Sequence, residues 1–310
     1  MSKDRLLNLL KIGLSVTLLT LLLRQVGWRQ TLGTLGKARL PHLAAAFALY
    51  LAGIVVRAWR WQVLLSALRM DIPLARLTVL YFVGTFFSNF LPTGIGGDVV
   101  RVYELSKQSK RPIESVGTVL LDRGTGLLML FLIALVTLIF SHRLITPNVV
   151  AAIVLLSLGS WAGLGLVLRR GWLERWGLLR LMARIKPLEG LYESIIACGS
   201  KAIGSALAIS LVFNALLIAV NYLIALSLGM EIPLWYFLLF VPLISFLLVL
   251  PISLSGLGVR EGGYVYLFAQ AGVSAPLALA MSLLFYALNV ATGLIGGALY
   301  AFEGMRNFRH

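Results

Sequence analysis

Hydrophobic residues occur along this chain in long runs that are separated by short polar stretches. A run of about 20 apolar residues is long enough to cross the hydrocarbon core of a bilayer as one helix. The first run follows a basic start, but it is too long for a usual signal peptide and no small-residue cleavage site follows it, so we interpret it as a retained helix. We predict spanning helices at residues 6–26, 42–61, 116–140, 148–168, 202–228 and 276–301.

Two further apolar runs, 74–91 and 234–250, are shorter, and a proline follows each of them at Pro92 and Pro251. Proline removes a backbone donor and disfavours helical geometry in the residue before it. A glycine-rich turn and a second half-length segment come next. A backbone break in lipid leaves polar groups unpaired unless protein or a wet cavity satisfies them. We therefore expect two broken, re-entrant hairpins whose turns face the protein interior.

Two motifs recur in the same order along the chain. "MDIPL" at 70–74 returns as "MEIPL" at 230–234, and "LPTGIGGDVVR" at 91–101 returns as "LPISLSGLGVR" at 250–260. The two offsets, 160 and 159 residues, differ by one residue. Such agreement predicts two copies of one unit, in which a spanning helix is followed by a broken hairpin and a second spanning helix.

Composition places the whole chain in the membrane. Hydrophobic residues make up 59% of it and charged residues 13%, whereas soluble domains carry about 25% charged residues. We predict an all-α polytopic membrane protein with about six full spans plus two re-entrant hairpins, built as two inverted repeats. Residues 1–310 form a single integral membrane domain with four parts: an N-terminal helix and interfacial segment (1–41), repeat 1 (42–140), a connecting helix and basic cytoplasmic connector (141–201) and repeat 2 (202–303).

Basic loops set the predicted orientation, because cytoplasmic loops of membrane proteins are rich in Lys and Arg. The connector 169–201 is strongly basic, whereas the loops 141–147 and 229–233 are nearly free of Lys and Arg. We therefore predict a multi-pass protein of the cell (plasma or inner) membrane with both termini in the cytoplasm. The first hairpin then enters from the cytoplasm and the second from outside, as in transporters with inverted repeats. Three residues depart from this scheme and fall outside: Arg29, Lys37 and Arg39.

The net charge of +15 is typical of contact with an anionic lipid surface. Because the basic residues are not interleaved on a soluble face, we predict no nucleic-acid partner. The chain has one cysteine and three scattered histidines, and it contains no HExxH motif, cysteine pair or carboxylate cluster. We therefore predict no metal and no cofactor.

The two helix breaks carry the candidate binding residues. We interpret Asp98 as the N-cap of a helix that starts at Val99, whose free N–H groups favour an anion. Arg101, one turn further, adds a forked donor suited to phosphate. Asp98 and Glu261 keep the arginines placed or accept a headgroup amine. The predicted substrate-binding residues are Asn89, Gly97, Asp98, Arg101, Asp122, Arg123, Ser255, Gly258, Arg260 and Glu261.

Each of these assignments has a structural alternative. Arg101 and Arg260 can snorkel to an interface or pair with Glu104 and Glu261. Asp98 can act as a cap alone, and Asp122 and Arg123 can form a local ion pair where the next helix opens. Near the end of the 42–61 run, we interpret two arginines beside tryptophans, Arg57 and Arg60, as interfacial anchors. We expect Asn214 and Asn221 to form hydrogen bonds between helices, and Asn89 can touch a ligand.

Three stretches, "NFLPTGIGGDVVRVYEL", "VLLDRGTGL" and "LPISLSGLGVREGGYVYLF", resemble the lysylphosphatidylglycerol synthase transmembrane family, also called the flippase-like domain family. The resemblance covers nearly the whole chain. It implies a membrane region that binds and translocates lipid, without the soluble domain that makes the aminoacylated lipid in two-part synthases. On this basis we expect no synthase activity. The family motif residues map to Pro92, Gly97, Asp98, Arg101, Asp122, Arg123, Gly258, Arg260 and Glu261.

The leading hypothesis is a lipid flippase or transporter, without enzymatic activity, that moves an anionic or phosphate-bearing lipid headgroup between leaflets through a cavity between the two hairpins. The alternative is a membrane enzyme or accessory subunit in lipid-linked glycan, hopanoid or aminoacyl-lipid metabolism. The predicted partners are a phospholipid or other anionic lipid and the membrane itself. Further candidates are a lipid-modifying enzyme and a second copy of the chain as a homo-oligomer.

Overall fold

The computed structural model describes residues 28–90, 96–141, 145–169, 185–249 and 256–307, and within these ranges the chain is helical, with no strand. Five helices are long and apolar enough to cross a membrane, which confirms five of the six predicted spans; the sixth, 6–26, lies outside the described residues. These spans are α3 (Leu40–Ala67), α6 (Pro112–Ser141), α7 (Pro147–Leu168), α11 (Gly199–Ser227) and the Ala275–Phe302 part of α14 (Ala275–Asn307).

The two short apolar runs also form helices, and each is followed by a second short helix. The segments between them, 91–95 and 250–255, lie outside the described residues, and so do Pro92, Pro251 and the candidate site residue Ser255. The shorter helices are α2 (Trp28–Leu35), α4 (Leu74–Phe90), α5 (Gly96–Ser109), α10 (Lys186–Ala197), α12 (Leu234–Val249) and α13 (Val259–Ala269).

The first helices of the two sequence copies, α3 and α11, pack along each other in opposite directions. At one end, the amide of Arg39 donates to the Ser227 carbonyl at 2.8 Å. At the other end, the Cys198 thiol lies 3.9 Å from the Leu64 carbonyl. Since the start of each helix meets the end of the other, the pair defines two opposite ends of the molecule.

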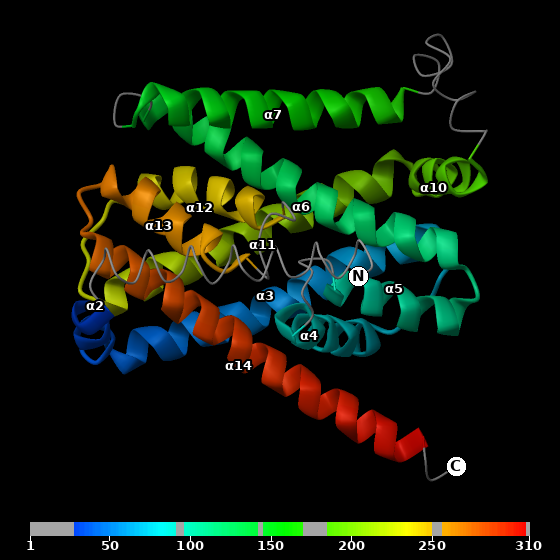
Figure 1. Ribbon diagram of the computed structural model, residues 1–310. Helices are drawn as coiled ribbons and strands as arrows, with labels where there is room; N and C mark the ends of the chain where they lie inside the picture. The colour runs from blue at the N-terminus through cyan, green and yellow to red at the C-terminus, as the bar shows by residue number, and fades with distance from the viewer. Residues whose placement is uncertain (1–27, 91–95, 142–144, 170–184, 250–255, 308–310) are drawn as a thin grey trace, which may run out of the picture.

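The two helix pairs begin and finish at different ends of the molecule (Figure 1). Arg111, just after α5, donates at 2.7 Å to the carbonyl of Leu68, which directly follows α3 and lies six residues before α4. Beyond α13, Gln270 accepts from the amide of Thr146 at 3.0 Å. The 30-residue helix α6 separates these two contacts, and at 1.5 Å per residue it is about 45 Å long. How the two pairs sit in a bilayer remains a prediction.

The recurring Met-acidic-Ile-Pro-Leu motif has the same local structure in both copies. The backbone φ is positive at Arg69 (56°) and Gly229 (73°), directly after α3 and α11. This left-handed turn pairs the last helical carbonyls. The same bond then recurs: Met70 N to Leu65 O and Met230 N to Ala225 O, both at 3.0 Å. The sequence repeat is therefore also a repeat of backbone geometry at this turn.

Packing brings the first helix pair against the last long helix. Helix α14 lies against α4, and Gly296 of α14 faces the backbone carbonyl of Phe82 so closely that a Cβ atom would collide with it. In a membrane, small residues at an interface allow helix backbones to approach each other closely. This contact holds α4 in place beside α3, α5 and α6.

Candidate functional site

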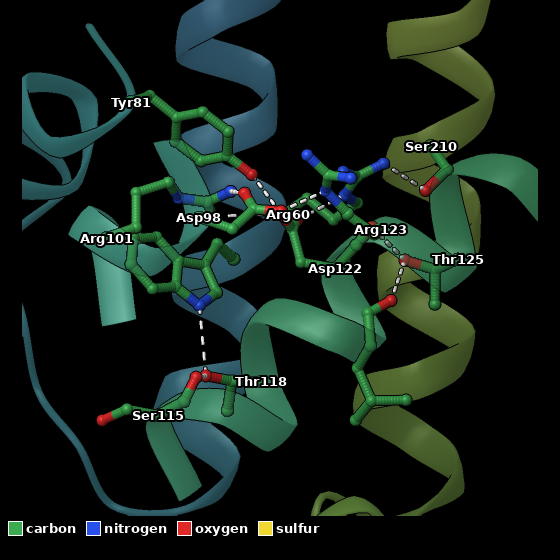
Figure 2. A network of polar contacts seen from close by, with 12 residues as sticks. Arg60, Tyr81, Asp98, Arg101, Ser115, Thr118, Asp122, Arg123, Thr125 and Ser210 are labelled. Atoms are coloured by element: carbon green, nitrogen blue, oxygen red, sulfur yellow. Dashed lines mark hydrogen bonds and ion pairs between the residues drawn. The ribbon is translucent and has the colours of Figure 1, made fainter. Parts of the chain in front are cut away.

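Asp122 of α6 is the centre of a buried ionic network (Figure 2). Only 1% of this residue is exposed. Its carboxylate accepts from Arg60 Nε at 2.7 Å, from Arg101 Nη2 at 3.0 Å and from the Tyr81 hydroxyl. The expectation that Asp122 lies where a helix opens is wrong, because α6 already begins at Pro112. In place of the local ion pair considered as an alternative, the structure shows partners of Asp122 on three other helices.

Arg101 of α5 is held between two aromatic rings and two carboxylates. Its guanidinium lies 3.7 Å from the centroid of the Tyr81 ring and 4.2 Å from that of Trp61. Its Nη1 donates to Asp98 at 3.1 Å, in addition to the bond with Asp122. Planar stacking and forked hydrogen bonds fix an arginine far better than a lysine, so the plane of this guanidinium is fixed.

Asp98 links the first helix pair to α6. It pairs with Arg101 one turn further along α5, and also with Arg123 of α6. Its expected role as the N-cap before Val99 is not observed, because α5 is helical from Gly96 and places Asp98 inside the first turn. The negative charge still lies at a helix start, where the helix dipole favours it.

Gly97 lets α5 approach α4 closely. A Cβ atom at this position would collide with the Gly84 carbonyl and the Ser88 hydroxyl, and the Gly97 amide donates to that hydroxyl at 3.2 Å. A side chain here would push α5 away from α4 and separate Asp98 and Arg101 from their partners. The predicted site residue Gly97 therefore lies within the cluster.

Arg60 lies in the protein interior and is not the interfacial anchor that was predicted. It is 3% exposed, and besides its bond to Asp122 it donates to Ser210 of α11 at 3.0 Å. Its neighbour Arg57, one turn earlier on α3, is half-buried and lies over the rings of Tyr81 and Phe213. Among the described residues Arg57 has no carboxylate partner, and its Nε is buried without a hydrogen bond. Sequence reasoning missed both, although cations within a predicted span usually mark a functional site.

A polar cavity of about 160 Å³ lies among these groups. Four guanidinium groups line it, and they keep their charge in proteins. Only two carboxylates face them, so the lining has two excess positive charges. The charged lining residues are Arg57, Arg60, Arg101, Arg123, Asp98 and Asp122.

A second, larger cavity of about 330 Å³ adjoins the first and is mainly apolar. Leucine, valine and phenylalanine side chains from α3, α6, α11, α12 and α14 dominate its lining. Five residues line both cavities, so the polar and apolar spaces meet along one boundary. The shared residues are Tyr50, Arg57, Arg60, Arg123 and Asn289.

The second sequence copy forms a separate buried cluster. Arg260 pairs with the adjacent Glu261 at 2.5 Å and donates to Ser282 of α14 at 3.2 Å. Glu261 also accepts from the amide of Gly258, where φ is +82° and the helix begins. None of these four residues lines either cavity described above. The structural alternative is therefore confirmed for Arg260, which pairs with Glu261, and not for Arg101, whose partners are Asp98 and Asp122.

The two clusters nevertheless contain one equivalent contact. Arg101 reaches Asp122 on the long helix that follows it, and Arg260 reaches Ser282, which lies 160 residues beyond Asp122. This offset is that of the repeated "MDIPL" motif. The second copy has no carboxylate at this position and uses Glu261 of its own helix instead.

The buried asparagines join helices, as predicted. Asn214 of α11 donates to the Gly126 carbonyl of α6 at 3.0 Å, and Asn221 accepts from the Tyr264 hydroxyl of α13 at 2.5 Å. Asn89 donates to the carbonyl of Asn289 at 3.4 Å, so it contacts a residue of the cavity boundary without lining it. The part of the chain that the structure describes contains no group of three or more His, Cys, Asp or Glu residues suited to a metal.

These features define a polytopic α-helical membrane protein with a charged cavity among its spans. The chain belongs to the lysylphosphatidylglycerol synthase TM region family, whose model matches residues 8–297. It is similar to a "UPF0104 membrane protein" of Methanothermobacter thermautotrophicus, with 25% identity over 288 residues that cover 85% of each chain. No solved structure matches it significantly.

Proposed function

We propose that this protein binds a phosphate-bearing lipid and moves its headgroup between the leaflets of the cell membrane. The observation that carries the proposal is the junction of the two cavities. The polar one has two excess positive charges and suits an anionic headgroup, and the apolar one suits an acyl or isoprenoid chain. A lipid with its phosphate beside Arg57 would occupy both.

Arg57 is the residue that we assign to first contact with the phosphate. Arg60 and Arg101 are already bonded to Asp122, whereas Arg57 lies over the Tyr81 and Phe213 rings and has no carboxylate partner among the described residues. Its buried, unpaired Nε–H carries a desolvation cost that a ligand oxygen would remove. Phosphate is the preferred ligand of a planar, forked donor.

The arrangement of the helix pairs supports movement of the lipid as well as binding. The pair α4–α5 begins and ends at one end of the molecule, and α12–α13 at the other (Figure 1). Broken helices that meet near the midplane from opposite sides form the substrate sites of many transporters. We place the basic end with Lys107, Lys110 and Arg111 in the cytoplasm.

A lipid-modifying enzyme receives less support, because its general base would need an accessible carboxylate. The candidates for such a base are Asp98, Glu104, Asp122 and Glu261, and each of them lies near an arginine. Asp98 and Asp122 each accept from two arginines. Glu104 lies 3.7 Å from Arg76, and Glu261 binds Arg260 and the start of its own helix.

Leaflet exchange tests the proposal. Purified protein in vesicles should move a fluorescent anionic phospholipid from the inner to the outer leaflet, measured by chemical quenching of the outer leaflet. Removing the charge in Arg57→Gln should slow protein-dependent exchange by about tenfold or more, given a loss of about 1.4 kcal/mol or more in binding the phosphate. Lys107→Gln, which removes an exposed cation of α5, should exchange at the wild-type rate. Equal rates for wild type and Arg57→Gln would reject this site.

A further inference from the structure

The charge of the polar cavity specifies its ligand more narrowly than a phosphate-bearing lipid. We infer that the preferred ligand is a lipid phosphomonoester, in which a terminal phosphate is attached directly to the membrane anchor. This inference rests on the proposed lipid site, but not on the movement of lipid between leaflets. The net charge and the unpaired donors of the polar cavity favour this class of ligand, and the volume of the cavity accommodates the phosphate.

The lining of the polar cavity carries an excess of positive charge. Four arginines and two aspartates line the cavity, and this leaves two positive charges. A phosphomonoester carries about −1.5 to −2 at pH 7, so it neutralises the lining almost fully. A phosphodiester such as phosphatidylglycerol carries one negative charge and leaves one cation unbalanced. Lysylphosphatidylglycerol has a net positive headgroup and would add repulsion to a cavity that is already positive.

The lining of the polar cavity also contains arginine N–H donors that have no acceptor among the described residues. Among the described residues, neither Arg57 Nε nor Arg101 Nε has a hydrogen-bond partner, although both atoms are buried and both residues line this cavity. Arg101 itself is only 4% exposed. A charged donor left unpaired in this way costs about 1–3 kcal/mol or more. The three terminal oxygens of a phosphomonoester offer more acceptors than the two of a diester.

The volume of the polar cavity is sufficient for a phosphate group. The polar cavity has a volume of about 160 Å³, and one water molecule needs about 10–15 Å³ of such volume. A phosphate group has five heavy atoms, so it fits in a space of this size. The apolar cavity beyond Arg57 remains available for the chain of the lipid.

Competition binding tests the inference with the full chain in detergent micelles. The probe is a fluorescent phosphatidate, and the competitors are phosphatidate, phosphatidylglycerol, lysylphosphatidylglycerol and glycerol 3-phosphate. Phosphatidate should displace the probe at least about tenfold better than phosphatidylglycerol, because it carries about one more negative charge into a positively charged cavity. Absence of probe binding, or equal or better displacement by either phosphatidylglycerol or lysylphosphatidylglycerol, would overturn the inference. Equal displacement by glycerol 3-phosphate would instead assign the site to a soluble phosphate.

Two variants test the charge argument directly. Arg57→Gln should reduce the preference for phosphatidate over phosphatidylglycerol to within about threefold, because one excess charge is removed from the cavity. Lys107→Gln should leave the wild-type preference unchanged. An undiminished preference in Arg57→Gln would overturn the argument. Failure of leaflet exchange in vesicles, with the binding preference intact, would reject lipid movement and leave this inference standing.

Discussion

Asp122→Asn is expected to destabilise the protein by about 3–5 kcal/mol, the usual cost when one partner of a buried ion pair is removed. The asparagine keeps the size of the side chain but removes the charge that balances Arg60 and Arg101. Both arginines are less than 5% exposed, so water can compensate only in part for the lost charge. The Tyr81 hydroxyl also loses its charged acceptor.

Thermal unfolding of the purified protein in detergent measures this effect. Glu104→Gln is the matched control, since Glu104 and its partner Arg76 are only partly buried and 3.7 Å apart; its expected cost is below about 1 kcal/mol. The double variant Arg60→Gln with Asp122→Asn should recover part of the loss, because it removes one stranded charge. An Asp122→Asn protein as stable as Glu104→Gln would contradict the described network.

Gly296→Val is expected to destabilise the protein by about 3 kcal/mol or more, at or above the upper end of the usual cost of overpacking. Even a Cβ atom at this position would collide with the backbone carbonyl of Phe82, and a backbone group cannot rotate away as a side chain can. Helix α14 would have to separate from α4, which carries Tyr81 of the ionic network.

The control for this substitution is a glycine that faces open space. Gly159 of α7 has nothing within 4 Å of a Cβ atom, so Gly159→Val should change the melting temperature little. A comparison of the two unfolding curves removes the shared effect of a β-branched residue in a helix. Equal melting temperatures for the two variants would show that α14 and α4 are not in close contact.

Hydropathy and the proline–glycine breaks predicted most of the fold. The spans at α3, α6, α7, α11 and α14 follow from the length of their apolar runs, and α4 and α12 follow from runs that stop early. The partners of Asp122 did not follow, because Arg60 lies 62 residues away on another helix. In a helix that is apolar on every side, the sequence pattern does not show which face points inward.

The same ambiguity explains why the burial of Arg57 and Arg60 was not predicted. An arginine near the end of an apolar run has the same sequence signature whether it anchors the helix at the interface or enters the interior. Their spacing of three residues places both on one helix face, and this was the available signal. Only the packing of α3 against α6 and α11 shows that this face is buried.

The most direct measurement of the central claim is native mass spectrometry of the purified protein. If the two cavities together hold an anionic lipid, wild-type protein should retain a lipid of this class after detergent removal, and Lys107→Gln should retain it equally. Arg57→Gln should lose most of it, because the excess positive charge at the cavity boundary is reduced. Equal retention of the same lipid by wild type and Arg57→Gln, or only zwitterionic lipid on the wild type, would contradict the account.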